Sequence, residues 1–327
     1  MTARSHLFAL FAVLAGCVVM AAAPCAALAG QGQETAAKAA AELAGLQRAL
    51  GEASAAKDWA KALTVARQMN DLLEWQHVEA LCRVARYEAL LGHTKEAYEV
   101  LQRAADTGLV DVWAIRKDEA FAAMRGDERF KKLTREMWLK AYIHLLERPE
   151  RNAYQKPEEV MQALAFKPGE RVADVGAGSG YFTVRVAKAV GPTGVVWAVD
   201  IAPELLDYLG RRAQELGLSN IKLVKVGPDD PQLPRAGVDT VLMVDTLHYI
   251  KERAAYAGKL KEGLAPGGRV VVIDFIPKAP GERPWGPPPE QNMSRQEVDT
   301  AMAAAGLVPV KVHDFLPEHF FVEYAVR

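Results

Sequence analysis

The segment VADVGAGSGY, residues 172–181, combines one acidic side chain with three glycines spaced two residues apart. Glycine accepts positive φ angles and lets the backbone approach a ligand closely. If a helix begins at about Tyr181, its first amides point toward the same place and attract a negatively charged group. We therefore predict a binding loop whose contacts come mainly from the backbone. Its predicted members are Gly176, Ala177, Gly178, Gly180 and Tyr181.

The acidic residue Asp174, which precedes the loop, discriminates between two ligands. A nicotinamide dinucleotide would need another glycine where Tyr181 stands, and its pyrophosphate would be repelled by the carboxylate. S-Adenosylmethionine suits the segment better, because its ammonium can bind Asp174, directly or through water, and its carboxylate can bind the helix-start amides. We predict S-adenosylmethionine as the cofactor and keep a nucleotide-dependent oxidoreductase as an alternative.

Other polar residues follow the later strand candidates. Asp200 ends the second strand and can accept hydrogen bonds from both ribose hydroxyls, and we include its neighbour Ile201 in the cofactor site. Asp229, in the turn after the third strand, is a candidate acceptor for the adenine amino group. The fourth strand ends in MVDTLHYI, which brings Asp245 and His248 to the same edge.

The strands that would position these residues are short apolar runs separated by helices. The runs are residues 172–175, 195–199, 221–226, 238–244 and 270–275. Near-continuous apolar strands with helical crossovers predict a parallel sheet covered on both faces, which binds ligands beyond the carboxyl ends of its strands. Two last strands, residues 307–313 and 319–326, are joined by a short connection and should pair as an antiparallel hairpin.

In this order and spacing, the pieces resemble the class I S-adenosylmethionine-dependent methyltransferases. The matching segments are VADVGAGSGYF (172–182), GVVWAVDIAPELLDYL (194–209), LPRAGVDTVLMVDTLHYI (233–250) and LKEGLAPGGRVVVIDF (260–275). The resemblance covers about residues 154–327. It implies an α/β fold with a seven-stranded, mostly parallel, doubly wound Rossmann-like sheet whose last strand is reversed. It also implies methyl transfer to an acceptor, which we expect to be a small molecule.

Two branches of that family are less similar to this chain. Arsenite methylators bind their substrate through several cysteines, whereas Cys82 is the only cysteine here after residue 29. The stretch AVGPTGVVWAVD (189–200) resembles protein isoaspartate methyltransferases, but the substrate-binding segments of those enzymes are not evident.

Methyl transfer requires a general base only if the acceptor carries a proton with a high pKa. We predict His248 as that base; the alternative is a rim histidine that bonds a neighbouring carbonyl. Asp245 and Asp274 resemble the paired carboxylates of metal-dependent catechol-type methyltransferases, but two oxygens are a sparse Mg²⁺ site. We therefore predict no metal, a cofactor contact for Asp245 and a solvated strand-end position for Asp274.

Residues that flank the sheet strands predict where the methyl acceptor binds. Tyr154, Gln155 and Trp285 are candidate walls of the acceptor pocket, with core packing or loop anchoring as the alternative. Residues 276–293 carry six prolines and predict an irregular loop, which is either a lid or a passive connection. After this loop, Ser294 and Glu297 form a predicted capping box that opens a helix.

Residues 30–150 predict an all-helical domain that precedes the methyltransferase domain, 151–327. Apolar residues recur at helical spacing, as at Ala97, Leu101 and Ala104. The segment YEALLGHTKEAYEVLQRAADTG (87–108) resembles a tetratricopeptide repeat, and the resemblance extends over roughly two repeats. A protein partner on the helical repeats and a plain helical spacer both remain open.

The N-terminus predicts export. Arg4 precedes an uncharged apolar stretch that reaches Ala29, so residues 1–29 read as a signal peptide. A lipid anchor at Cys17 and an uncleaved membrane anchor are the alternatives. We expect a periplasmic or secreted protein. The net charge of −1 over 327 residues gives no indication of nucleic-acid binding.

Export conflicts with the supply of S-adenosylmethionine, which is made in the cytoplasm. The alternative function is therefore an exported non-catalytic ligand-binding or scaffold protein that acts through its helical repeats. The intact glycine loop and Asp200 favour the enzyme.

Overall fold

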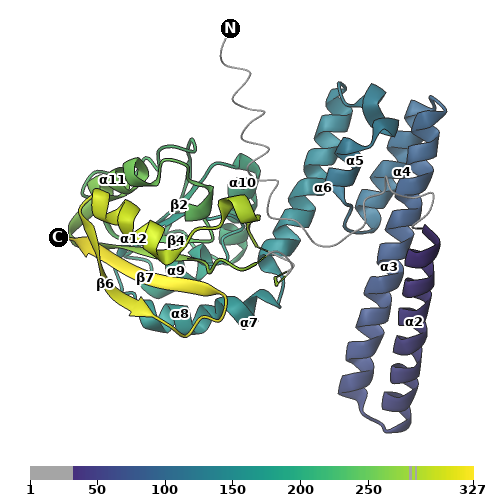
Figure 1. Ribbon diagram of the computed structural model, residues 1–327, viewed down its shortest axis with the longest axis horizontal. Helices are drawn as coiled ribbons and strands as arrows, with labels where there is room; N and C mark the ends of the chain where they lie inside the picture. Colours follow the sequence, from purple (N-terminus) through teal and green to yellow (C-terminus); the bar gives the residue numbers. More distant parts are fainter. Residues whose placement is uncertain (1–31, 280–281, 284–285) are drawn as a thin grey trace. The chain divides into compact units, whose positions relative to one another are not determined.

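The computed structural model describes residues 32–279, 282–283 and 286–327. The described chain divides into a helical unit that ends at Tyr142 and an α/β unit that runs from Ile143 to Arg327 (Figure 1). The predicted signal peptide, Cys17 and Trp285 lie outside the described residues. Among the helices that are described, no stretch is both long and apolar enough to cross a membrane.

The helical unit consists of helices joined by short turns. Its elements are α2 (Gly32–Ala55), α3 (Trp59–Leu90), α4 (Thr94–Thr107), α5 (Val112–Lys117), the 3-10 helix η2 (Glu119–Met124) and most of α6 (Glu128–Glu147). The side chain of Asp58 caps α3, and Gly92 makes the turn into α4 at a φ of 80°. Ala97, Leu101 and Ala104 of α4 are fully buried, which confirms the predicted helical face. The resemblance to tetratricopeptide repeats stays a prediction.

The α/β unit is built on one seven-stranded sheet. Its strands are β1 (Arg171–Val175), β2 (Val195–Asp200), β3 (Ile221–Lys225), β4 (Val238–Val244), β5 (Leu264–Phe275), β6 (Leu307–His313) and β7 (His319–Val326). Their order is β3-β2-β1-β4-β5-β7-β6. Strands β1 to β5 are parallel, whereas β7 is antiparallel to β5 and β6. The predicted doubly wound sheet with a reversed last strand is confirmed.

Helices cover both faces of the sheet (Figure 1). They are α7 (Arg151–Gln155), α8 (Pro157–Leu164), α9 (Thr183–Val190), α10 (Pro203–Glu215), η3 (Leu247–Tyr249), α11 (Arg253–Gly263), η4 (Pro289–Gln291) and α12 (Arg295–Ala304).

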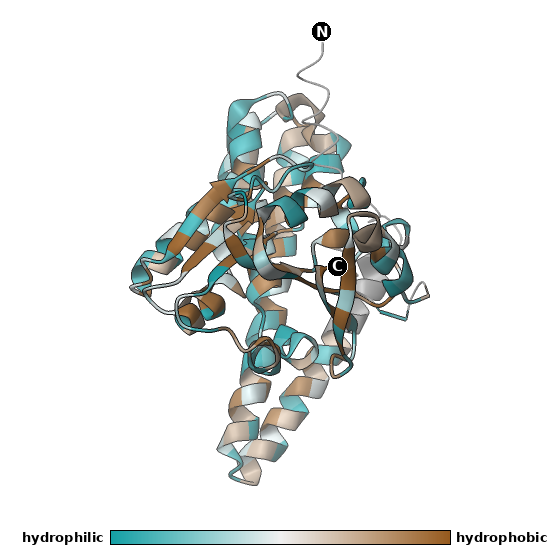
Figure 2. Cartoon of the chain, turned by 90° about the vertical axis from the view of Figure 1, so that its left-hand side faces the viewer, coloured by the Kyte–Doolittle hydropathy of each residue, from teal (hydrophilic) through white to brown (hydrophobic). Residues whose placement is uncertain are grey.

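Strand β4 shows how one strand supplies two cores. Val241 and Met243 pack in a cluster with α11 and α12, and Leu242 and Val244 pack in a cluster with α8 and α9. Side chains alternate across a strand, so a stretch that is buried on both faces tends to be apolar at consecutive positions, as residues 241–244 are. In Figure 2 the strands of the sheet accordingly carry the hydrophobic colour.

Two boundaries differ from the predicted ones. Helix α9 spans Thr183–Val190, so it begins two residues after the predicted start near Tyr181, although the Val184 amide already donates to the Gly180 carbonyl at 3.0 Å. Strand β5 begins at Leu264, which pairs with Val238 across a shift in register. The predicted capping box is confirmed, with Ser294 and Glu297 bonded reciprocally at the start of α12.

Leu242, at the centre of the sheet, offers a test of this core. Its side chain is fully buried, so Leu242→Ala should lower the free energy of unfolding of the α/β unit by about 3 kcal/mol through lost contacts and a residual cavity. Leu216→Ala is the matched control, because Leu216 is 45% exposed and its loss should cost less than about 1 kcal/mol. Urea denaturation followed by circular dichroism measures both, and equal losses would contradict the assigned core.

Candidate functional site

The predicted site residues gather at the carboxyl edge of the sheet. Asp174, Asp200 and Asp274 lie at the ends of β1, β2 and β5, and Asp245 directly follows β4. The strand order reverses between β1 and β4, which is where doubly wound sheets bind their ligands. The turn that carries Asp229 follows β3, and its side chain is exposed. The fold therefore brings the predicted residues to one edge, and their roles stay predictions.

The glycine loop requires its glycines. Gly176 has a φ of 81° and Gly180 a φ of 86°, both in the region that other residues rarely adopt. A Cβ atom on Gly176 would overlap the side chain of Thr246, and one on Gly180 would overlap Leu209. The loop thus packs so closely on β4 and α10 that only bare backbone fits.

Asp200 holds this loop in place. Its Oδ2 accepts a hydrogen bond from the Gly178 amide at 2.8 Å, and its Oδ1 accepts one from the Ala202 amide at 2.9 Å. Burial raises the pKa of Asp200, and the backbone donors oppose that rise. A carboxylate oxygen has two lone pairs, so each oxygen of Asp200 keeps the capacity to accept a ribose hydroxyl.

Asp174 lies beneath the loop and is 3% exposed. Burial raises its pKa to about 6, and nearby Asp200 adds to the rise. Thr183, at the start of α9, opposes it by donating a hydrogen bond to Oδ2 at 2.6 Å. Two buried carboxylates at one edge favour a ligand that brings a positive charge or hydrogen-bond donors.

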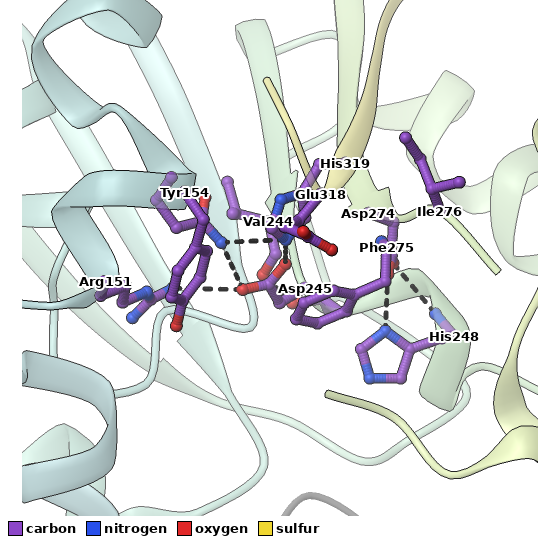
Figure 3. Close-up of polar contacts among 12 residues, drawn as sticks. Arg151, Tyr154, Val244, Asp245, His248, Asp274, Phe275, Ile276, Glu318 and His319 are labelled. Carbon is purple, nitrogen blue, oxygen red and sulfur yellow. Dashed lines mark hydrogen bonds and ion pairs between the residues drawn. The ribbon is translucent and has the colours of Figure 1, made fainter. Parts of the chain in front are cut away.

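A second cluster forms around Asp245, as Figure 3 shows. The side-chain amide of Gln155 donates to Asp245 Oδ2 at 2.5 Å, and Arg151 Nη2 lies 3.4 Å from the same oxygen. His319 Nε2, from β7, lies 2.9 Å from Oδ1. Burial opposes the charge, yet His319 and Arg151 hold the pKa of Asp245 below its usual value. Asp245 is therefore a carboxylate with partners from α7 and β7.

The backbone of Asp245 is also unusual. Its φ of 53° places it in the left-handed region, which aspartate tolerates better than most residues but at a cost. Its amide donates to the Ile273 carbonyl at 2.9 Å, so the residue is held to β5 while the chain turns away. The turn aims the carboxylate at α7 and β7.

His248 and Asp274 form a buried pair next to this cluster. His248 Nδ1 lies 2.7 Å from Asp274 Oδ1, and the His248 amide donates to Oδ2 at 3.2 Å. We expected a solvated Asp274, and this expectation is wrong: the side chain is 1% exposed and also accepts from the Phe275 amide. The alternative predicted for His248 was a hydrogen bond to a neighbouring carbonyl. Its ring bonds the Asp274 carboxylate instead.

Asp245 and Asp274 therefore have different side-chain partners, Asp245 on α7 and β7 and Asp274 at His248. Among the described residues, no group of three or more His, Cys, Asp and Glu side chains is arranged to hold a metal.

Aromatic rings surround the two clusters. The ring of His319 stacks on Tyr154 with ring centroids 5.9 Å apart, and it contacts the ring of Phe275 in a tilted arrangement with centroids 4.4 Å apart. Tyr154 and Gln155, the predicted pocket walls, therefore lie beside Asp245, with Gln155 itself fully buried. The sequence alone did not identify Arg151 or His319 as site residues. For His319 the reason is that its position opposite Phe275 depends on the pairing of β7 with β5, which is not apparent from the neighbouring residues.

These features fit S-adenosylmethionine. The buried pair Asp174 and Asp200 suits an ammonium and hydroxyl donors, and the closely packed glycine loop lies directly above the pair. Asp174, Asp200 and the loop would hold the amino-acid end and the ribose, and Asp229 is exposed for an adenine amino group.

Comparison with known proteins agrees with this geometry. A family model described as a methyltransferase domain matches residues 166–303. Protein-L-isoaspartate O-methyltransferase of Aeropyrum pernix is 39% identical over 116 residues, which are 35% of this chain and 42% of that protein. Aklanonic acid methyltransferase of a Streptomyces strain is 28% identical over 159 residues, which are 49% of this chain and 66% of that protein. The chain thus spans only part of the length of these curated relatives.

A solved structure extends the similarity to a complete fold. The S-adenosylmethionine-dependent methyltransferase of Aquifex aeolicus is 30% identical, with a TM-score of 0.52. The alignment covers 57% of this chain and 97% of that protein. With the strand order, the glycine loop and the family model in agreement, the chain belongs to the S-adenosylmethionine-dependent methyltransferases.

Proposed function

We propose that this protein transfers a methyl group from S-adenosylmethionine to a small-molecule acceptor. The observation that carries the proposal is the closed glycine loop above two buried carboxylates, Asp174 and Asp200, at the point where the strand order reverses. The methyltransferase domains of the curated relatives support the same reaction class.

The cofactor would supply an activated methyl group on a sulfonium, so the protein has mainly to bind, orient and exclude water. Asp174 would bind the ammonium and Asp200 the ribose hydroxyls. Asp245, which follows β4 and stays ionised, would attract the positively charged cofactor.

The acceptor would meet the residues of α7, β4, β5 and β7. Tyr154 is partly exposed there, with the buried rings of His319 and Phe275 behind it, and its ring suits an acceptor with a flat apolar part. Asp274 fixes the His248 proton on Nδ1 and would stabilise the imidazolium, so His248 is the candidate to take a proton from an O–H or N–H acceptor.

We further propose that residues 1–29 direct export to the periplasm or the medium, with a lipid anchor at Cys17 as the alternative. The helical unit would then offer a surface to a protein partner. The apolar N-terminal stretch supports export, and the repeat-like segment 87–108 supports the binding surface. If the α/β unit bound no cofactor, the alternative of a non-catalytic scaffold protein would be favoured over the enzyme.

Asp200→Ala tests the cofactor site. It removes an acceptor for the ribose and for the Gly178 amide, so binding of S-adenosylhomocysteine, the demethylated product, should weaken by about 1–3 kcal/mol, roughly 5- to 150-fold. Isothermal titration calorimetry of the full chain measures the affinity. The exposed Asp207 of α10 provides the control Asp207→Ala, which should bind as the wild type does. Unchanged affinity in Asp200→Ala would reject the assignment, and binding of NAD instead would reject the proposed function.

The raised pKa of Asp174 predicts a pH dependence. The ionised form binds a cation, so affinity for S-adenosylhomocysteine should be nearly full above about pH 7 and fall about tenfold between pH 7 and pH 5, as Asp174 takes up a proton. Asp174→Asn should bind more weakly at pH 7 and lose most of this dependence. Parallel titrations at the two pH values measure both effects, and an equally steep dependence in the variant would assign it to another group.

A further inference from the structure

The middle of the glycine loop is tied to Glu147, a residue of α6 that lies outside the cofactor site described above. Ser179 is 1% exposed, and its hydroxyl donates to Glu147 Oε1 at 2.5 Å. Arg212, from α10, donates to the same carboxylate oxygen at 2.5 Å and to the Ser179 carbonyl at 3.2 Å. Glu147 and Arg212 thus hold both the side chain and the backbone of Ser179.

Glu147 comes from outside the recognised domain. It is the last residue of α6, whereas the family model begins at residue 166 and the sequence resemblance at about residue 154. A glutamate at this end is unfavourable for the helix itself, because the last turn carries the negative end of the helix dipole. Its position is therefore explained by its partners and not by the helix.

The preceding residue, Leu146, reinforces this arrangement. Its carbonyl accepts a hydrogen bond from Arg151 Nη1 at 2.8 Å. Its Cδ1 lies 3.1 Å from the point where a Cβ atom of Gly178 would stand. The last turn of α6 therefore covers the loop at Gly178 and bonds it at Ser179.

We propose that Glu147 is a positioning residue for the cofactor loop, an inference that rests on the proposed function. The Gly178 amide is fixed from one side by Asp200, and Ser179 is fixed from the other side by Glu147 and Arg212. A loop held in this way binds its ligand without a further loss of backbone entropy. Glu147 acts through Ser179 and makes no contact with the cofactor.

The test compares affinities for S-adenosylhomocysteine in the full chain by isothermal titration calorimetry. Glu147→Ala removes both bonds and should weaken binding about tenfold, as expected for lost charge-assisted hydrogen bonds. Glu147→Gln keeps an oxygen for Ser179 but not the charge for Arg212, so its loss should be about threefold. Glu150→Gln, an exposed change of the same charge three residues away, should bind as the wild type does.

Ser179→Ala removes the serine side of the bond and leaves the pair Glu147 and Arg212 intact. It should weaken binding at least threefold, and combining it with Glu147→Ala should add little, because both changes remove the same bond. Hydrogen exchange of the free protein should quicken at residues 176–181 in Glu147→Ala, with α12 unchanged. A purely structural role would not confine the change to the loop.

The outcomes separate the two proposals. If the wild type binds no S-adenosylhomocysteine, the proposed function fails and the inference fails with it. If the wild type binds and Glu147→Ala binds within twofold of it, only the inference is overturned. If Glu147→Ala does not fold, Ser179→Ala decides, and wild-type affinity in that variant overturns the inference.

Discussion

The hydrogen bond from the Gly178 amide to Asp200 is the constraint on which the cofactor side of this protein depends. It joins the loop after β1 to the end of β2, and it can form only because the glycines allow the backbone to lie against β4 and α10. The amides of Gly176 and Ala177 complete the closure by donating to the Val199 carbonyl. The loop is therefore shaped before any ligand binds, which is the condition for strong electrostatic recognition.

The other side of the site depends on Asp245, a partly buried carboxylate of a different kind. Asp245 stays charged because Arg151, Gln155 and His319 surround it, although burial alone would favour the neutral form. A buried charge is tolerable only when its partners are complete, so the position of α7 and the position of β7 are linked through Asp245. Asp174, whose side chain accepts a hydrogen bond from the neutral Thr183 hydroxyl, instead has a pKa raised by burial.

The sequence predicted what local patterns determine. The alternation of apolar runs and helices predicted the sheet, and the glycine spacing predicted the loop, since both depend on residues that are neighbours in the chain. The burial of Asp274 and the partners of Asp245 could not be predicted in this way. They depend on which strands become neighbours and in which register, as in the pairing of Phe275 with His319. The contact of Glu147 with Ser179 could not be predicted for the same reason, because nothing near Glu147 in the sequence points to Ser179.

The position of β7 has a consequence for how the chain folds. This strand follows β6 in sequence but lies between β5 and β6 in the sheet. Strand β6 has no other neighbour, and β5 has an open edge until β7 arrives, so both present unpaired backbone during assembly. The pairing of β6 with β7 is local in sequence, whereas the pairing of β7 with β5 joins segments that a loop, α12 and β6 separate, and such long-range contacts form more slowly. Because His319 lies on β7, opposite Phe275, the acceptor side of the site is complete only when β7 has paired with β5.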